Sequence, residues 1–249
     1  MKLVLAEPKL FKDSISTISA LVNEVHIRVD KNMLEIIAMD PANVAMVVFN
    51  MLSPAFVEYE VSKEKTLCIN LDSLNQILRR IKPTDTVQLE LDENKGKLVV
   101  KARGESSRTF HIALLDSEHK EQKIPELKFP AKVEMPSYVF DEAMEDMNIV
   151  AESVALTAEK NRFIIESESK MNAAKVEVTS DDEADISTDK SENIVSKYSL
   201  EYLKKIAGGA KLSDKVILQF GQEYPLKASF KIIDKLSLSI ILAPRVMND

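Results

Sequence analysis

The sequence predicts an α+β protein made of two tandem duplicated domains, and three observations lead to this prediction. The two halves of the 249-residue chain align at a constant offset. In each half, stretches with the apolar spacing of a helix are followed by groups of strand-like stretches. A charged, proline-containing segment separates the halves. Because 45% of the residues are hydrophobic, the chain can bury a sizeable core, and its composition argues against disorder.

The repeat has a constant spacing of 129 residues. Phe11 lies 129 positions before Phe140, and Leu74 lies the same distance before Leu203. The segment "VHIRVDKNMLEIIA" aligns with "VALTAEKNRFIIES", and "LNQILRRIKPTDTVQLEL" aligns with "LKKIAGGAKLSDKVILQF", without a gap between the two blocks. The comparison predicts a shift of register only in the last hairpins of each half. The alignment therefore predicts that both halves share one fold.

The first helix is predicted over residues 9–22, because its apolar residues recur at helical spacing. The apolar stripe contains Leu10, Ile15, Ile18, Leu21 and Val22, whereas Lys12, Asp13, Ser16, Thr17 and Asn23 lie off it. A half-buried strand follows at 25–29, where apolar and polar residues alternate. Residues 30–32 form a turn, and two more strands are predicted at 34–39 and 44–51.

A second, shorter helix is predicted over residues 71–81. Its inward-facing residues are Leu71, Leu74, Ile77, Leu78 and Ile81. Strands are then predicted at 86–91, 97–102 and 107–114. One unit is therefore a strand, a helix and three strands, and the chain contains four such units. The predicted domains are residues 1–115 and 132–249, joined by a connecting loop over residues 116–131.

The central segment "DSEHKEQKIPELKFPAK", Asp116 to Lys132, is highly charged and contains two prolines. This composition is typical of a linker between domains. At roughly 15 residues it is longer than most connections within a compact domain, and long connections often carry a function. Two interpretations remain open: a solvated tether, or a connector that takes part in binding.

The composition limits the classes of protein to which the chain can belong. Its net charge is −7, which disfavours a partner with a phosphate backbone if the charge is evenly spread. No run of 18 apolar residues occurs, and the first residues, "MKLVLAEPKLFKD", do not form a signal peptide, so a soluble intracellular protein is expected. Cys68 is the only cysteine, so no disulfide can form within the chain, and a buried, inert thiol is expected.

No catalytic or metal-binding pattern is evident in the sequence. The three histidines, His26, His111 and His119, do not stand at metal-ligand spacing with Cys68 or a carboxylate. A P-loop and a G-x-G-x-x-G motif are both absent, and the pair Gly208-Gly209 is interpreted as a helix C-cap. Neighbouring acids that could bind Mg²⁺ form no convergent set; they are Glu142, Glu145, Asp181, Asp182 and Glu183. We therefore expect a protein without enzymatic activity, cofactor or metal.

Several motifs occur in an order that identifies a family. The tandem copies, the acidic connector ending in "IPEL", the segment "AMDPANVAMVVF" and the terminal "LAPRV" together resemble the sliding clamps of the proliferating cell nuclear antigen type. The resemblance covers essentially the whole chain and looks archaeal. It implies a cytoplasmic, nucleoid-associated protein if the source is archaeal, and a nuclear one if it is eukaryotic.

The resemblance implies a head-to-tail homotrimer that closes into a ring, with the sheets outside and the helices lining a hole for duplex DNA. A heterologous interface that closes leaves no free sheet edge. The edges that pair across the subunit boundary in the family correspond to 108–113 and 173–178, which contain Phe110, Lys175 and Val176. The expected DNA-facing residues, on or beside the helices, are Lys12, Arg79, Lys204, Lys205 and Lys211. Any one of these cations could instead be simply solvated.

One helix departs from the family pattern, because "FDEAMEDMN" is acidic where a lining helix should be basic. Glu142 and Asp146 are four residues apart and share a face. We expect them to meet cations of the neighbouring subunit, namely Arg80, Lys82 and Arg108. The alternative is an acidic, solvated face.

The resemblance also implies that DNA polymerase, a clamp loader, a flap nuclease and a ligase bind through short peptides. The pocket for these peptides would be formed by Met39, Val44, Met46, Gln122, Ile124, Pro125, Pro225, Ala243 and Pro244. Gln122 stands where relatives often have an aliphatic residue, and Val44 and Met46 could instead pack in the core. The terminal "RVMND" could pair with a bound peptide as a strand.

Two other functions remain possible from the sequence. The chain could be one subunit of a heteromeric clamp specialised for repair or checkpoint signalling. It could also be a duplicated protein-interaction module without a DNA function.

Overall fold

A computed structural model describes residues 1–116, 122–180, 183–189 and 193–245. The chain forms two compact units. The first contains residues 1–41, 47–122 and 232–238, and the second contains residues 42–46, 123–231 and 239–249.

The described part of the first half of the chain contains two α-helices, one 3-10 helix and nine strands. In chain order they are β1 (Lys2–Leu5), α1 (Lys9–Ser19), β2 (Glu24–Val29), β3 (Met33–Met39), β4 (Ala45–Leu52), η1 (Ser53–Ala55), β5 (Glu58–Glu60), β6 (Lys65–Asn70), α2 (Leu71–Arg79), β7 (Thr86–Asp92), β8 (Lys97–Arg103) and β9 (Ser107–Ala113).

The described part of the second half has the same composition of elements. In chain order they are β10 (Ala131–Pro136), α3 (Ser137–Met147), β11 (Ser153–Glu159), β12 (Arg162–Glu168), β13 (Ala173–Thr179), β14 (Asp185–Thr188), β15 (Ile194–Ser199), α4 (Leu200–Ala207), η2 (Gly208–Lys211), β16 (Lys215–Phe220), β17 (Leu226–Ile232) and β18 (Leu236–Leu242).

The predicted α+β fold with two repeated halves is confirmed. Strands β12, β15, β17 and β18 begin and end 129 positions after β3, β6, β8 and β9. The predicted shift of register in the last hairpins is therefore wrong. Strand pairing depends on backbone hydrogen bonds and alternating burial, which many residue types satisfy, so the residues diverge while the backbone positions stay constant. The short edge strands β5 and β14 were not predicted, because three or four residues are too few for a recognisable pattern.

The helices form where their apolar stripes can be buried. In α1, Phe11, Ile15 and Ile18 are fully buried. Thr17, which was predicted off this stripe, is only 5% exposed. Its hydroxyl donates a hydrogen bond to the Asp13 carbonyl at 3.0 Å, which permits the burial of this polar group. Helix α2 begins at an N-cap, where the Asn70 side chain accepts a hydrogen bond from the backbone N–H of Ser73 at 2.9 Å.

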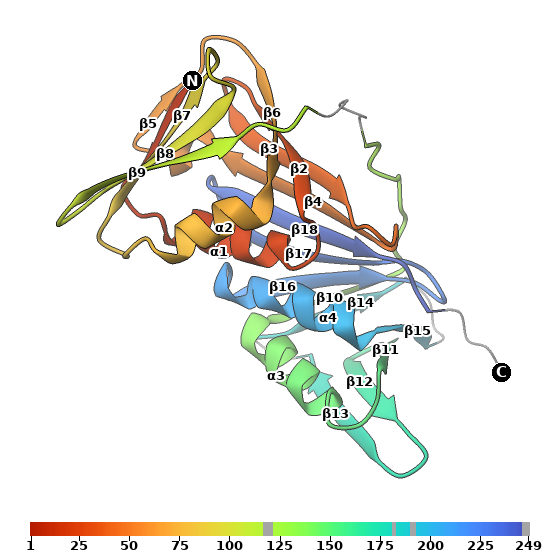
Figure 1. The fold of residues 1–249 in the computed structure, drawn as a ribbon. Coiled ribbons are helices and arrows are strands. Elements are labelled where there is room, and N and C mark those ends of the chain that lie inside the picture. The colour runs from red at the N-terminus through yellow and green to blue at the C-terminus, as the bar shows by residue number, and fades with distance from the viewer. Residues whose placement is uncertain (117–121, 181–182, 190–192, 246–249) are drawn as a thin grey trace. The chain divides into compact units, whose positions relative to one another are not determined.

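Each unit combines sheets with a pair of helices. In the first unit the strand orders are β5-β1-β7-β8-β9 and β4-β3-β2-β6, and in the second they are β14-β10-β16-β17-β18 and β13-β12-β11-β15. Helices α1 and α2 lie side by side in the first unit, as do α3 (green) and α4 (light blue) in the second (Figure 1). Among the described residues, β9 and β13 are the last strands of their sheets. Each therefore leaves one line of backbone groups without a partner strand.

The core of each unit is built on large aromatic side chains. Phe11 and Phe49 are fully buried in the first unit, and Phe163, Phe220 and Phe230 in the second. Burying each such side chain contributes about 1.5–3 kcal/mol to folding. The packed core therefore holds the sheets and leaves one face of each helix pair in solvent.

Two further sequence predictions concern single features. Cys68 is buried, as predicted. In the described part of the chain, no helix has both the length and the apolar character needed to cross a bilayer.

Candidate functional site

The five predicted DNA-facing cations all lie on helices or at helix ends. Lys12 is on α1, Arg79 ends α2, Lys204 and Lys205 are on α4, and Lys211 ends η2. Arg79 and Lys211 are exposed, whereas Lys12 is half-buried and its Nζ donates a hydrogen bond to the Ile81 carbonyl at 3.2 Å. Each helix pair therefore carries positive side chains on its outer surface.

The cations of α4 are paired with carboxylates of the same unit. The Nζ of Lys204 lies 3.3 Å from the Glu145 carboxylate on α3. The Nζ of Lys205 lies 2.8 Å from Glu201 and 5.2 Å from the ring centre of Tyr202. The hydrogen bond from Lys205 lowers the pKa of the Glu201 carboxyl below its usual range. These pairs offset part of the positive charge of α4.

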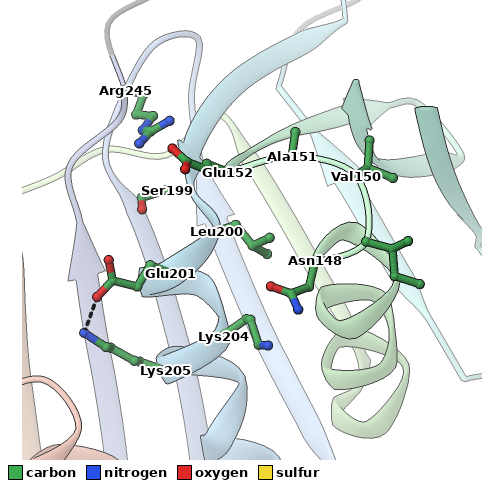
Figure 2. Close-up of a pocket in the computed structure, with 11 residues that line it drawn as sticks. Asn148, Val150, Ala151, Glu152, Ser199, Leu200, Glu201, Lys204, Lys205 and Arg245 are labelled. Atoms are coloured by element: carbon green, nitrogen blue, oxygen red, sulfur yellow. Dashed lines mark hydrogen bonds and ion pairs between the residues drawn. The ribbon is translucent and has the colours of Figure 1, made fainter. Parts of the chain in front are cut away.

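A cavity of about 700 Å³ lies between the C-terminal end of α3 and the N-terminal end of α4 (Figure 2). It is lined by Asn148, Ile149, Val150, Ala151, Glu152, Ser199, Leu200, Glu201, Lys204, Lys205 and Arg245. Three of these side chains are cationic and two are carboxylates, so the cavity favours neither an anion nor a cation. It therefore resembles a polar surface depression more than a site for one class of small molecule.

The outer face of α3 combines carboxylates with large exposed side chains. Tyr138 is 59% exposed and Ile149 is 78% exposed, and they flank the exposed carboxylates of Glu142 and Asp146. Positions 138, 142 and 145 follow helical spacing within α3 and share one face, and Ile149 lies in the turn just after the helix. We call these residues the α3 stripe (Tyr138, Glu142, Glu145, Asp146, Ile149). Exposed apolar side chains next to polar ones are typical of interaction surfaces.

Strand β9 carries Arg108 and Phe110 on its inner face. Arg108 Nη2 forms an ion pair with the carboxylate of Asp85, and Nη1 donates a hydrogen bond to the Arg80 carbonyl at 2.8 Å. Lys82 lies 2.7 Å from Glu105. Two of the three cations predicted to meet a neighbouring subunit therefore have partners in their own chain, and the third, Arg80, is exposed.

Strand β13 places Lys175 exposed and Val176 half-buried at the edge of its sheet. Lys175 forms an ion pair with Glu177, and Arg162 Nη1 lies 3.4 Å from the same carboxylate. The hydrogen bond from Lys175 lowers the pKa of Glu177. The edge strand thus carries one cation and one carboxylate, and they pair with each other.

The predicted peptide pocket is partly apolar surface and partly core. In the second unit, Ile124 is 47% exposed, Pro125 and Ala243 are exposed, and Val44, Pro225 and Pro244 are half-buried. The Ala243 N–H donates to the Val44 carbonyl at 2.8 Å, which joins residues 42–46 to the segment after β18. Met46 is only 5% exposed and packs in the core. In the first unit, Met39 is half-buried at the end of β3 and Gln122 is exposed.

Some sequence predictions fall outside the described residues. These are His119, Asp181, Asp182 and the last four residues of the terminal "RVMND". Within the described ranges, no three His, Cys, Asp or Glu side chains gather in a way that could hold a metal ion.

Sequence reasoning missed two residues of structural importance. The carboxylate of Asp85 is 3% exposed, although no sequence pattern singled this residue out. Gly208 caps α4 as predicted, but its φ of −53° is right-handed, and the chain continues into η2. The next residue, Gly209, is buried against Phe230. A C-cap requires only one glycine. The second glycine was therefore a sequence signal for close packing.

Comparison with known proteins identifies the chain's relatives. Residues 1–122 match the family model "Proliferating cell nuclear antigen, N-terminal domain", and residues 123–245 match the corresponding C-terminal domain. The chain is 34% identical over 247 residues to a DNA polymerase sliding clamp of Nanoarchaeum equitans. This alignment covers 98% of this chain and 99% of that protein. It is 33% identical to a DNA polymerase sliding clamp of Pyrococcus furiosus, with 98% of both chains covered.

Solved structures share the fold. Proliferating cell nuclear antigen from Entamoeba histolytica gives a TM-score of 0.91 at 22% identity, with 98% of each chain covered. A PCNA from Thermococcus kodakaraensis gives a TM-score of 0.91 at 23% identity, with 98% of this chain and 99% of that chain covered. A PCNA2-PCNA3 complex from Sulfolobus tokodaii gives a TM-score of 0.88 at 23% identity, also with 98% of this chain and 99% of that chain covered.

Proposed function

The chain belongs to the proliferating cell nuclear antigen family of DNA sliding clamps, and from this premise we propose that three copies close into a ring around duplex DNA. The ring acts as the processivity factor of a DNA polymerase. It holds the polymerase near its template by enclosure, which requires no chemical reaction, so the protein has no catalytic activity of its own.

The two sheet edges support ring closure. Strand β9 ends one sheet of the first unit and β13 ends one sheet of the second, so a copy can offer each edge to a different neighbour. Such a head-to-tail interface forms a ring when its rotation closes, and closure then covers every exposed edge of this kind. The α3 stripe adds carboxylates and apolar side chains on the unit that carries β13, and Arg80 and Lys82 add cations on the unit that carries β9.

The helices supply the surface that faces DNA. Lys12, Arg79, Lys204, Lys205 and Lys211 contact phosphates without reading bases, which permits sliding along any sequence. Because Glu145 and Glu201 pair with Lys204 and Lys205, the attraction to DNA is moderated. A moderate attraction suits a ring that must move along the duplex.

Partner proteins bind at the exposed apolar surface of the second unit. Ile124, Pro125, Ala243 and the half-buried Pro225 and Pro244 offer apolar contacts to the aliphatic and aromatic side chains of a short peptide. DNA polymerase, a clamp loader, a flap nuclease and a ligase dock in this way. Both sliding-clamp relatives named above are archaeal, so the protein is associated with the nucleoid.

The single observation that carries the proposal is the match along the whole chain to DNA polymerase sliding clamps at 33–34% identity. The PCNA2-PCNA3 complex suggests a second candidate, in which this chain is one subunit of a heteromeric ring. Sedimentation equilibrium of the pure chain distinguishes the two. A homotrimer has three times the chain mass of 28.0 kDa, whereas a heteromeric subunit alone does not reach it.

A further inference from the structure

We infer that Asp85 is a positioning residue for the subunit edge: it holds Arg108, and thereby the hairpin end of β9, in the place where β9 pairs with a second copy. The inference rests on the proposed ring. It assigns to Arg108 a role within its own chain, in place of the expected ion pair with a neighbour.

The Asp85 carboxylate is the centre of a small network. Its Oδ2 accepts a hydrogen bond from the backbone N–H of Lys82 at 3.0 Å and forms an ion pair with Arg108 Nη2. Arg108 Nη1 donates to the Arg80 carbonyl at 2.8 Å. The guanidinium therefore joins β9 to both ends of the turn that leads from α2 to β7.

Burial makes this network obligatory. The Asp85 side chain is 3% exposed and that of Arg108 is 29% exposed. A carboxylate removed from water needs hydrogen-bond donors and an opposite charge, and removal of one partner leaves the other uncompensated. We therefore expect Arg108 to keep its ion pair with Asp85 when a second copy binds.

The hairpin also leaves room for this carboxylate. A Cβ atom on Gly104 would collide with the Oδ1 atom of Asp85, so a larger residue at position 104 displaces the carboxylate or the turn. The Gly104 N–H donates to the Ser106 carbonyl at 3.2 Å, within the turn that joins β8 to β9. Glycine at this position therefore permits the ion pair.

The location of the pair explains why it affects association. Arg108 stands opposite Ala102 of β8, and Asp85 directly precedes β7. The ion pair therefore passes over β8 and links the edge strand β9 to the start of β7. Further along the same face, Ile112 is only 5% exposed and is held by the core. The hairpin end of β9 has Arg108 in place of an apolar anchor. An edge held in its paired conformation loses less entropy when a partner strand is added.

The test compares two variants with a matched control. Asp85→Asn removes the charge that holds Arg108, and Gly104→Ala keeps both charges but crowds the carboxylate. Glu93→Gln breaks only the exposed pair with Lys65, at residues outside the proposed interface. Sedimentation of each variant over a range of concentrations gives the trimer dissociation constant. We expect Asp85→Asn and Gly104→Ala to weaken association by about tenfold or more, and Glu93→Gln by less than about threefold.

Arg108→Lys and Arg108→Gln separate the two roles of Arg108. If Arg108 acts through Asp85 and the Arg80 carbonyl, lysine cannot make both contacts and weakens the trimer as much as glutamine. If Arg108 instead attracts carboxylates of the neighbour, lysine retains most of the association, and our inference is wrong. Hydrogen exchange at residues 107–113 should rise in monomeric Asp85→Asn, an effect that a purely intersubunit role would not produce.

The outcomes distinguish this inference from the proposed function. A wild-type chain that stays monomeric refutes the ring. A wild-type trimer whose association and β9 exchange are unchanged by Asp85→Asn refutes the role of Asp85 alone. If Asp85→Asn does not fold, Gly104→Ala, which removes no charge, decides the question by the same measurements.

Discussion

A Cβ atom on Gly209 would lie 2.5 Å from the Cδ2 atom of Phe230, so the fully buried ring leaves no space for a side chain at this position. Gly209 is part of η2, and Phe230 is in the centre of β17. The close approach packs the end of the α4–η2 segment against the sheet of the second unit. The position of Lys204, Lys205 and Lys211 on the helix surface depends on this packing.

Replacement of this glycine should destabilise the protein. We expect Gly209→Ala to lower the free energy of unfolding by about 1–3 kcal/mol, because the added methyl group forces the Phe230 ring to move. The neighbouring Gly208 has a φ of −53° and is only half-buried, so Gly208→Ala should be neutral or stabilise by up to about 1 kcal/mol. Urea unfolding measures both. Equal effects of the two substitutions would contradict the packing described here.

The buried Tyr198 should make stability depend on alkaline pH. Its hydroxyl donates a hydrogen bond to the Tyr224 carbonyl at 2.6 Å, and burial raises the pKa of the Tyr198 phenol above its ordinary value of 10.0. In the unfolded chain the phenol ionises near pH 10, while in the fold it stays neutral. Its contribution is therefore complete below pH 10 and is lost as the pH rises toward the folded pKa.

Tyr198→Phe should cost about 0.5–1.5 kcal/mol at neutral pH through the lost hydrogen bond. The difference from wild type should shrink above pH 10, because only wild type loses the phenol's contribution there. Urea midpoints between pH 7 and 11 measure this difference. Tyr138→Phe is the control, since Tyr138 is 59% exposed. A difference that stays constant with pH would rule out this account of Tyr198.

The carboxylates of the α3 stripe should be needed for association. We expect Glu142→Lys with Asp146→Lys to convert the proposed trimer to monomer, because both side chains are exposed and reversal would replace the proposed attraction to Arg80 and Lys82 with repulsion. Sedimentation velocity reports the species. Glu60→Lys with Glu64→Lys makes the same charge change elsewhere and should leave the trimer intact. A persistent trimer after the first pair would show that α3 is only a solvated acidic face.

The exposed apolar surface of the second unit should bind partner peptides. Ile124→Ser should weaken binding of a synthetic peptide with aliphatic and aromatic anchors by about tenfold, which corresponds to losing about 1.4 kcal/mol of apolar contact. Because Ile124 is 47% exposed, the fold should be unaffected. Ile233→Ser, at a side chain that is 87% exposed, is the matched control for calorimetric titration. Unchanged affinity in Ile124→Ser would place the peptide elsewhere.

Much of the fold could be predicted because the chain contains it twice. A pattern that is ambiguous in one half, such as the strand at 33–39, gains support from its counterpart at 162–168. The limits of α1 could not be predicted to the residue. Leu21 and Val22 continue its apolar stripe and are buried, yet they lie beyond its last residue, Ser19. Burial of a periodic residue does not require helical backbone.

The sequence could predict that the candidate cations lie on or beside helices, but it could not predict their pairings. Spacing along a helix places Lys204 on the surface of α4, but its proximity to Glu145 depends on how α3 and α4 pack. Asp85 lies in "KPTD", a pattern that predicts an ordinary turn. Its burial follows from Arg108, which is 23 residues away in the chain. Pairings of this kind depend on tertiary structure, which periodicity does not encode.

The most direct test of the central claim is retention of the protein on a linear duplex whose ends are blocked after the protein has threaded on. The salt concentration is then raised until phosphate contacts are screened. If the protein encircles DNA, wild type stays on the blocked duplex and leaves when a restriction enzyme opens one end. Arg79→Gln with Lys205→Gln should slow threading but not shorten retention. Loss from blocked and open duplexes at the same rate would show that the protein does not encircle DNA.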